Sequence, residues 1–210
     1  MYFKNREEAG VLLYRLLEKY KKKDVVVYAL PRGGVVTAFE IAKHFRAPLD
    51  LIITRKIGHP QSPEYAIAAT AENGHILGKE WELKSVGKEW LKKEVEKEKL
   101  EAKRRRKKYL KGRHEIDVEG KVAILVDDGI ATGFTMRVGI MELRHRKPKK
   151  IVVAIPVIPK GTAKILSREA DEVVALDIPS DDKFLGSVSA YYEEFPQVTD
   201  EEVVKILKEA

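Results

Sequence analysis

The chain contains no cysteine, so it can form no disulfide bond, use no thiolate nucleophile and build no cysteine-based metal site. Its five histidines show none of the paired spacings that hold a catalytic zinc ion. No apolar run approaches the roughly 20 residues that a membrane-spanning helix needs. The first ten residues also lack the apolar stretch of a secretory signal peptide. We therefore expect a soluble, cytoplasmic protein with no membrane partner.

Charge is what the chain has in excess. Charged residues make up 35% of the sequence, against about a quarter in typical domains. The net charge of +7 is concentrated in one segment, 79–113, which holds fifteen Lys and Arg against seven Asp and Glu. Apolar residues still make up 44% of the chain, enough for a sizeable core. The length suits a single domain over residues 1–210.

Short apolar runs alternate with helical patterns along the chain. Runs of this kind, rich in β-branched residues and bounded by turns, are typical of strands buried on both faces of a parallel sheet. The five runs lie at 25–30, 49–54, 121–126, 151–156 and 172–176. Helical spacing of apolar residues between them predicts crossover helices. We predict an α/β fold with a five-stranded parallel sheet flanked by helices.

The remaining segments have distinct roles in this plan. A capping pattern at Asn5 and Glu8 predicts a helix over roughly 6–20. The glycines and prolines of 57–78 predict a mobile loop, with a possible hairpin turned at Asn73-Gly74. Residues 79–113 are expected to be one long basic helical segment with a possible break at Gly87. The tail, 177–210, is expected to form a small hood with the other end of the chain.

The most informative segment covers residues 123–135 and reads AILVDDGIATGFT. Its first four residues end a buried strand. That strand delivers the adjacent carboxylates Asp127 and Asp128 to the carboxyl edge of the sheet, where open α/β sheets bind their ligands. Two carboxylates at such a place can hold ribose hydroxyls or Mg²⁺.

A turn of small residues follows the acids and opens a helix. Gly133 would let backbone N–H groups approach an anion closely, and Thr132 and Thr135 add hydroxyl donors. The helix N-terminus supplies a favourable dipole, so the turn predicts a phosphate cradle. A Walker A loop lacks its Gly-Lys-Ser/Thr here, and a Rossmann site lacks its G-x-G-x-x-G. Alternatively the acids merely end a strand, but that would not require acids, glycine and threonine at these joint spacings.

This segment resembles the signature of type I phosphoribosyltransferases, which bind 5-phosphoribosyl 1-pyrophosphate (PRPP). The resemblance implies that Asp127 and Asp128 are catalytic and hold the sugar, directly or through the cofactor Mg²⁺. It implies that the 5-phosphate binds to the loop residues Ala131, Thr132, Gly133, Phe134 and Thr135. Four further segments are similar to those of one subgroup of the family, whose acceptor is unassigned: LPRGGV, APLD, RKIGHP and YYEEFPQV.

Two further clusters follow strand ends. Arg32 offers a forked donor for phosphate oxygens, and Gly33 and Gly34 permit unusual backbone angles. In the family this loop binds pyrophosphate, often through a strained backbone. Arg55 and Lys56 follow the second strand, where the family places basic groups near the pyrophosphate. Alternatively, the first cluster is only a turn, and the cations of the second are only solvated.

Three weaker features also have ordinary structural explanations. Glu64 lies in the predicted mobile loop and could anchor it, touch substrate or be a solvated acid. The basic run Lys103–Lys108 invites a nucleic-acid interpretation, but a solvated helix face with ion pairs explains it as well. Tyr191, Tyr192 and Phe195 could stack on a nucleobase, although packing of the tail against the core is favoured.

The resemblance implies an enzyme that transfers the 5-phosphoribosyl group from PRPP to a nitrogen nucleophile, a nucleobase in the favoured interpretation, with release of pyrophosphate. Its partners would be PRPP, a small-molecule acceptor and a second copy of the chain in a homodimer, without nucleic acid. The alternative is a non-enzymatic PRPP or nucleotide sensor that binds RNA or DNA through its basic helix. Nothing in the sequence selects a purine, a pyrimidine or orotate.

Overall fold

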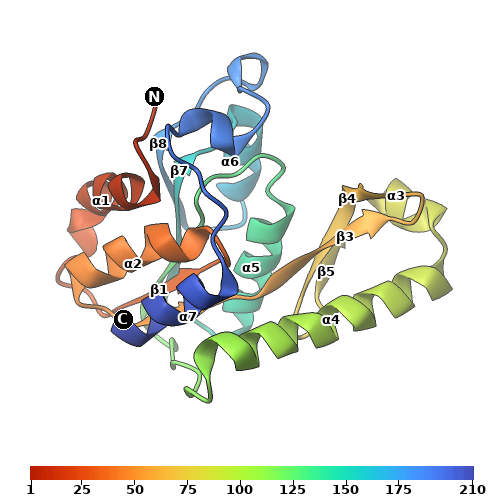
Figure 1. The fold of residues 1–210 in the computed structure, drawn as a ribbon, viewed down its shortest axis with the longest axis horizontal. Helices are drawn as coiled ribbons and strands as arrows, with labels where there is room; N and C mark the ends of the chain where they lie inside the picture. Colours follow the sequence, from red (N-terminus) through yellow and green to blue (C-terminus); the bar gives the residue numbers. More distant parts are fainter.

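The apolar runs form a central sheet in the computed structural model, which describes residues 1–210 (Figure 1). In spatial order its strands are β2 (Leu49–Leu51), β1 (Val25–Ala29), β6 (Val122–Val126), β7 (Lys150–Val157) and β8 (Glu172–Asp177). Every neighbouring pair is parallel. The predicted five-stranded parallel sheet flanked by helices is confirmed.

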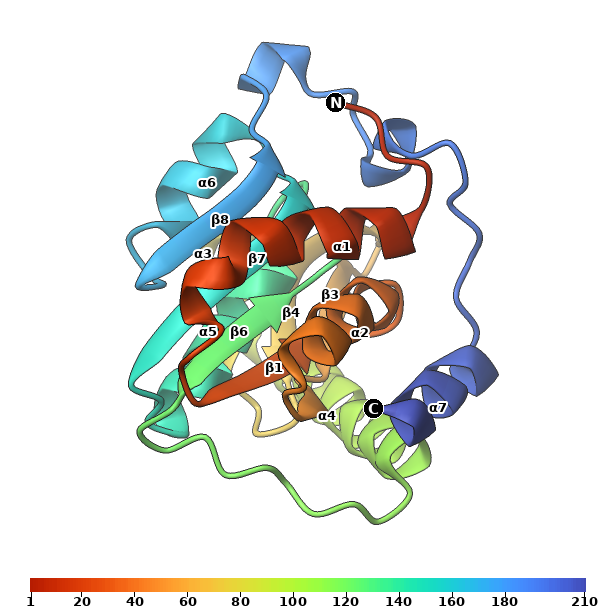
Figure 2. The same cartoon turned by 90° about the vertical axis from the view of Figure 1, so that its left-hand side faces the viewer.

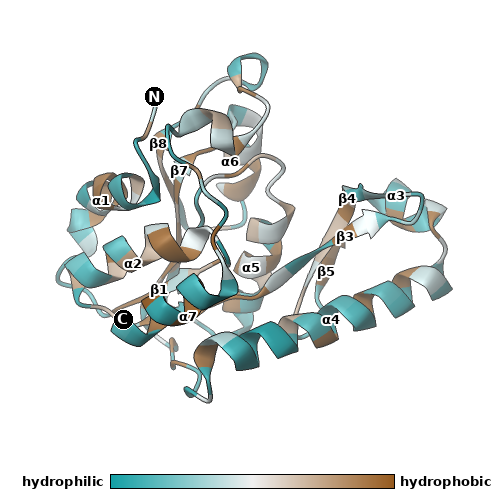
Figure 3. Ribbon diagram, in the orientation of Figure 1, coloured by the Kyte–Doolittle hydropathy of each residue, from teal (hydrophilic) through white to brown (hydrophobic).

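Helices cover both faces of this sheet because the strands are apolar on both sides. Alternate residues of one strand enter different cores: Val27 packs in one and Val26 in the other. One face is covered by α1 (Arg6–Leu17) and α2 (Gly34–Phe45), with α7 (Asp200–Glu209) packed beside α2, and the other by α5 (Phe134–His145) and α6 (Lys160–Leu166) (Figure 2). No helix is long and apolar enough to cross a bilayer, and the longest is largely hydrophilic (Figure 3).

An arm projects from the body where the sequence predicted a mobile loop (Figure 1). It is an antiparallel sheet of β3 (Thr54–His59), β4 (Ser62–Ala71) and β5 (Ile76–Gly78), followed by α3 (Glu80–Ser85) and α4 (Lys88–Leu110). The expected loop over 57–78 is strand for most of its length: of the prolines and glycines that suggested a loop, Pro60 and Gly74 lie between strands, whereas Gly58, Pro63 and Gly78 lie within them. The hairpin turn at Asn73-Gly74 is present, as is the helix break at Gly87, whose φ is 79°.

The N-terminal residues meet the tail near the carboxyl edge of the sheet. Phe3 forms a parallel bridge with Tyr192, and its N–H donates to the Tyr191 carbonyl at 2.8 Å. Both tyrosines are buried in a small cluster with Phe3, so they pack against the core as favoured from the sequence. The tail continues through two short 3-10 turns, Asp181–Lys183 and Val188–Tyr191, to α7.

Many side chains of the basic run at the end of α4 form ion pairs or hydrogen bonds within the protein. Arg104 and Arg105 both pair with Glu101, and Lys108 pairs with Asp200 of α7. Arg106 turns inward and donates to the Leu51 carbonyl at 2.8 Å. It also lies 3.4 Å from the carboxylates of Asp50 and Glu72. The run therefore joins α4 to the body, because its side chains contact the edge strand β2 and the C-terminal helix.

We expect Arg106→Gln to cost about 3 kcal/mol of unfolding free energy, because it leaves the Asp50 carboxylate, which is 1% exposed, without its cation. The exposed Arg104 is the matched control from the same run. Arg104→Gln should cost no more than about 0.5 kcal/mol. Urea unfolding of both variants measures the difference. Equal, small losses would mean that the whole run is a solvated face.

A pH dependence is expected for the docking of α7. Hydrogen bonds from Lys108 and Tyr109 lower the pKa of Asp200 to about 2, so its charge stabilises the fold above the ordinary aspartate pKa and this contribution is lost as pH falls through 2. Asp200→Asn should be less stable than the parent at pH 7. The gap should shrink between about pH 4 and pH 2. Urea midpoints measured across this range would contradict the assignment if the gap stayed constant.

Candidate functional site

The candidate site lies where the strand order of the sheet reverses. From β1 the chain moves outward to β2, whereas from β6 it moves the other way to β7 and β8. Open α/β sheets bind ligands in the crevice that such a reversal opens at the carboxyl ends of the strands. Parallel pairing of Ala29 with Val126 brings the turns after β1 and β6 together at this edge.

A cleft of about 470 Å³ opens there. Residues from five parts of the chain line it: the turns after β1 and β6, the start of β3, the inner face of α4 and the tail. The lining residues predicted from the sequence are Arg32, Gly33, Arg55, Lys56, Asp127, Asp128, Ala131, Thr132, Gly133 and Thr135. Segments far apart in sequence thus converge on one space.

The two adjacent acids occupy different environments. Asp127 is half-buried at the cleft, and desolvation of its carboxyl group together with the neighbouring charge of Asp128 raises its pKa well above the usual value. The Asp127 Oδ1 atom accepts a hydrogen bond from the Asp128 N–H at 2.9 Å. Asp128 is held from outside the cleft, because its Oδ2 atom lies 2.7 Å from Nε of Arg6. Its carbonyl accepts from the Tyr192 hydroxyl at 2.6 Å.

The turn after the acids opens α5 through a glycine in the left-handed region. Gly133 precedes the first residue of α5 and has a φ of 77°, which favours glycine. The Ile130 N–H donates to the Val157 carbonyl at 2.9 Å, and the Thr162 hydroxyl donates to the Ala131 carbonyl at 2.9 Å. These two bonds fix the turn against β7 and α6. The N-terminus of α5 therefore faces the cleft with its turn held in place.

The turn after β1 needs glycine for close packing against the acids. A Cβ on Gly33 would lie 1.9 Å from Oδ2 of Asp128, and one on Gly34 would lie 2.9 Å from the Cα atom of Asp127. The peptide bond between Pro31 and Arg32 is cis. The Arg32 guanidinium lines the cleft, with its NH1 atom 3.7 Å from the Asp200 carboxylate.

Three more cations enter the cleft from the arm. Arg55 and Lys56 belong to β3, and Arg105 belongs to α4. Arg55 pairs with Glu98 of α4 at 2.6 Å, which ties the base of the arm together. Lys56 lies close enough to the acid pair to lower the pKa of Asp127, although burial outweighs it. The cleft is therefore lined by four cations, counting Arg32, as well as by the turn that opens α5.

Some predicted residues do not line the cleft. Phe134 packs in a small cluster with Val138 of α5, and Gly34 lies behind Gly33. Glu64 is exposed on β4, in the projecting arm. Sequence reasoning missed Arg105 as a cleft residue, because the basic run Lys103–Lys108 was interpreted as a whole. The position of Arg105 on the inner face of α4 is the signal that could have separated it from its neighbours.

Comparison with known proteins agrees with this geometry. A family model described as the phosphoribosyl transferase domain matches residues 2–193. Since the match spans most of the sequence, this chain belongs to the phosphoribosyl transferase domain family. The crystal structure of TT1426 from Thermus thermophilus is similar with a TM-score of 0.83 and 36% identity, covering 100% of this chain and 99% of that one.

The curated relatives that match in sequence include proteins from two bacteria. The Mycobacterium tuberculosis protein named "Putative phosphoribosyl transferase Rv0571c" is 37% identical over 210 residues, 99% of this chain and 47% of its own length. The chain thus spans about half the length of that relative. The "Bifunctional protein PyrR" of Clostridium kluyveri is 37% identical over 92 residues, which is 39% of this chain and 51% of that protein.

The contact between Gly33 and Asp128 can be tested without any ligand. We expect Gly33→Ala to cost about 2 kcal/mol of stability, because the added Cβ has to displace the Asp128 carboxylate. In an Asp128→Ala background the same change should cost at least about 1 kcal/mol less. The control is Gly112→Ala, at a φ of 84° with nothing within 4 Å. Its cost should be the same in both backgrounds. Additive Gly33 and Asp128 effects in urea unfolding would contradict the contact.

Proposed function

We propose that this chain transfers the 5-phosphoribosyl group from PRPP to a nitrogen nucleophile and releases pyrophosphate. The bond from C1 of the sugar to the pyrophosphate oxygen would break, its electron pair leaving with the pyrophosphate, as a C1–N bond forms. Membership of the phosphoribosyl transferase domain family supports the class of reaction. The observation that carries the assignment is one cleft lined together by an acid pair, a helix N-terminus and a group of cations.

The 5-phosphate would bind at the turn that opens α5. Backbone N–H groups of Ala131 to Thr135 surround the N-terminus of that helix, where an anion is favoured by the helix dipole. Thr132 and Thr135 line the same space and can donate hydroxyl hydrogen bonds. Because hydrogen bonds to β7 and α6 fix this turn, little ordering would be needed when the phosphate binds.

The sugar would lie against the acid pair. Asp128 is held by Arg6 through one oxygen, while its Oδ1 atom has no hydrogen-bond partner within the protein, so it can accept from a ribose hydroxyl. Developing positive charge on the sugar ring would be stabilised by a preorganised carboxylate at this place. We assign Asp127 and Asp128 as the catalytic acids on this basis.

The pyrophosphate would lie on the cationic side of the cleft. Arg32, Arg55, Lys56 and Arg105 line that side. Arginine pairs with phosphate oxygens in a forked geometry. The Gly33 backbone lies against the acids without a Cβ in between, which brings this side within reach of the sugar.

Mg²⁺ fits the acid pair in chemistry. Carboxylate oxygens are ligands that Mg²⁺ accepts, and the ion often takes its remaining ligands from water and substrate phosphates. No group of three acidic or histidine side chains in this protein is arranged to hold a metal ion, so such a site would depend on substrate oxygens. Asp127 and Asp128 would hold the ion. When bound, it would supply positive charge beside the leaving pyrophosphate.

Binding to PRPP is the first test. PRPP with Mg²⁺ at about a hundred times its dissociation constant should add roughly 2.7 kcal/mol to stability, a rise of roughly 5–10 °C in melting temperature for a chain of this length. The phosphate and sugar roles separate in two variants. In Thr132→Val/Thr135→Val, inorganic phosphate and ribose 5-phosphate should both bind more weakly, by about tenfold.

Asp128→Asn should leave inorganic phosphate binding unchanged and lower the affinity for ribose 5-phosphate, because the cradle is intact and only the sugar contact is weakened. Isothermal titration calorimetry of the folded variants measures both ligands. No melting shift with PRPP and Mg²⁺ would overturn the proposal. Pyrophosphate release with a panel of nucleobases then identifies the acceptor, and PRPP binding without turnover on any base would favour a sensor.

A further inference from the structure

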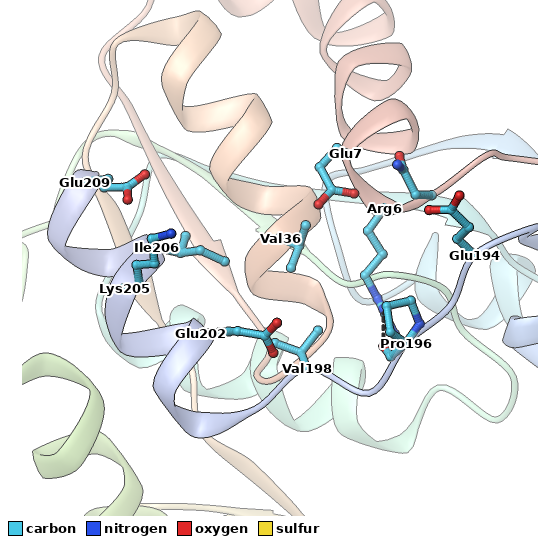
Figure 4. Close-up of a pocket in the computed structure, with 11 residues that line it drawn as sticks. Arg6, Glu7, Val36, Glu194, Pro196, Val198, Glu202, Lys205, Ile206 and Glu209 are labelled. Carbon is cyan, nitrogen blue, oxygen red and sulfur yellow. Dashed lines mark hydrogen bonds between the residues drawn. The ribbon is translucent and has the colours of Figure 1, made fainter.

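Arg6 makes three contacts at the edge of the site although its sequence context marks it only as the first residue of a helix. Asn5 caps α1, which places Arg6 at the first helical position. The residue is 6% exposed. Its Nε atom donates to Oδ2 of Asp128 at 2.7 Å, and its NH1 atom donates to the Pro196 carbonyl at 2.7 Å (Figure 4). Its guanidinium carbon lies 3.6 Å from the centre of the Phe195 ring.

Burial of a guanidinium is costly unless its charge is paired and its donors are satisfied. Here the pairing is directed at one atom of a candidate catalytic acid. The ion pair occupies Oδ2 of Asp128, and the Oδ1 atom of that carboxylate has no hydrogen-bond partner within the protein. A carboxylate held through one oxygen by an arginine has a fixed plane, so the direction of its other oxygen is fixed as well.

The surroundings of this contact leave the pair little room to move. The absent side chain of Gly33 makes the space, since a Cβ there would lie 1.9 Å from Oδ2 of Asp128 and 3.0 Å from Nε of Arg6. The Tyr192 hydroxyl holds the backbone of Asp128 at its carbonyl. On its other side Arg6 lines a separate cavity of about 310 Å³ between α1, α2 and α7 (Figure 4). Arg6 thus stands between that cavity and the acid.

The same side chain orders part of the cleft wall. Phe195 lines the cleft, and the guanidinium of Arg6 lies over its ring. Pro196 is bonded through its carbonyl to the same guanidinium. A cation over an aromatic face at this distance is attractive. One arginine therefore joins the N-terminal helix, the acid and the tail.

We propose that Arg6 is a positioning residue that sets the orientation of Asp128 for the sugar and holds Phe195 in the cleft wall. This rests on the proposed function, in which Asp128 contacts the ribose. The role is indirect: Arg6 acts through Asp128, and the phosphate cradle at α5 does not depend on it. Loss of Arg6 should therefore weaken the grip on the sugar and spare the grip on the phosphate.

The test compares the affinities of ribose 5-phosphate and inorganic phosphate by calorimetry. In Arg6→Gln the advantage of ribose 5-phosphate over phosphate should fall by about tenfold, while phosphate binding stays within about twofold of the parent. Arg6→Lys keeps the charge and should recover at least half of the loss on a logarithmic scale. Arg146→Gln is the matched control, because Arg146 is a similarly buried, ion-paired arginine at the C-terminal end of α5, away from the cleft. It should lower stability without changing either affinity.

A double variant tests whether Arg6 acts through Asp128. Arg6→Gln in an Asp128→Asn background should cause no further loss of ribose 5-phosphate affinity, because the contact that it orients is already impaired. Additive losses would overturn the positioning role, as would unchanged sugar discrimination in a folded Arg6→Gln. If Arg6→Gln fails to fold, the same affinities are compared for Arg6→Lys in the parent and in the Asp128→Asn background, and that comparison decides. If the parent itself binds ribose 5-phosphate no better than phosphate, the proposed function fails and this inference falls with it. A parent with clear discrimination and an Arg6 variant equal to it rejects the positioning role alone.

Discussion

The parallel pairing of β1 with β6 is the constraint on which the site depends. Val25 to Ala29 lie beside Val122 to Val126 in register, so both strands end at one level. The Leu30 N–H continues the ladder to the Val126 carbonyl at 3.0 Å. The turn after β1 must then pass directly beside the acids that follow β6. Glycine at 33 is a consequence of this register, because a side chain there would occupy the space of the Asp128 carboxylate.

Much of the body could be predicted because its signals are local. The three central strands of the sheet, β1, β6 and β7, are apolar runs that are continuous enough to be buried on both faces. The arm was harder to predict for the opposite reason. β3 and β4 pair across a tip that contains Pro60 and Gln61, and only β4 has a clear apolar stretch, at 66–71. The segment 57–78 is ordered by antiparallel strand pairing, which its composition does not predict.

The candidate site likewise contains residues that local signals predict and residues that depend on long-range contacts. Segments adjacent to strand ends, such as Asp127-Asp128 and Arg32-Gly33, could be located from the sequence because topology brings strand ends together. Arg6 could not, since its role depends on a contact with a residue 122 positions away in the chain. Arg105 was missed for another reason: a run such as Lys103–Lys108 does not act as a unit, because Arg104 is mostly exposed while Arg106 is mostly buried.

The charges around the cleft limit the class of ligand that it can bind. The helix N-terminus and the cations that line the cleft each favour an anion. The acid pair that lines the same cleft would repel a continuous polyanion passing through it. A ligand with two separate anionic groups joined by a neutral, hydroxyl-bearing middle satisfies all three regions at once. The pairing of Asp128 with Arg6 reinforces this selection, because it fixes one oxygen of the acid and leaves the other to accept from hydroxyl groups. A phosphorylated, pyrophosphorylated sugar has this distribution of charge.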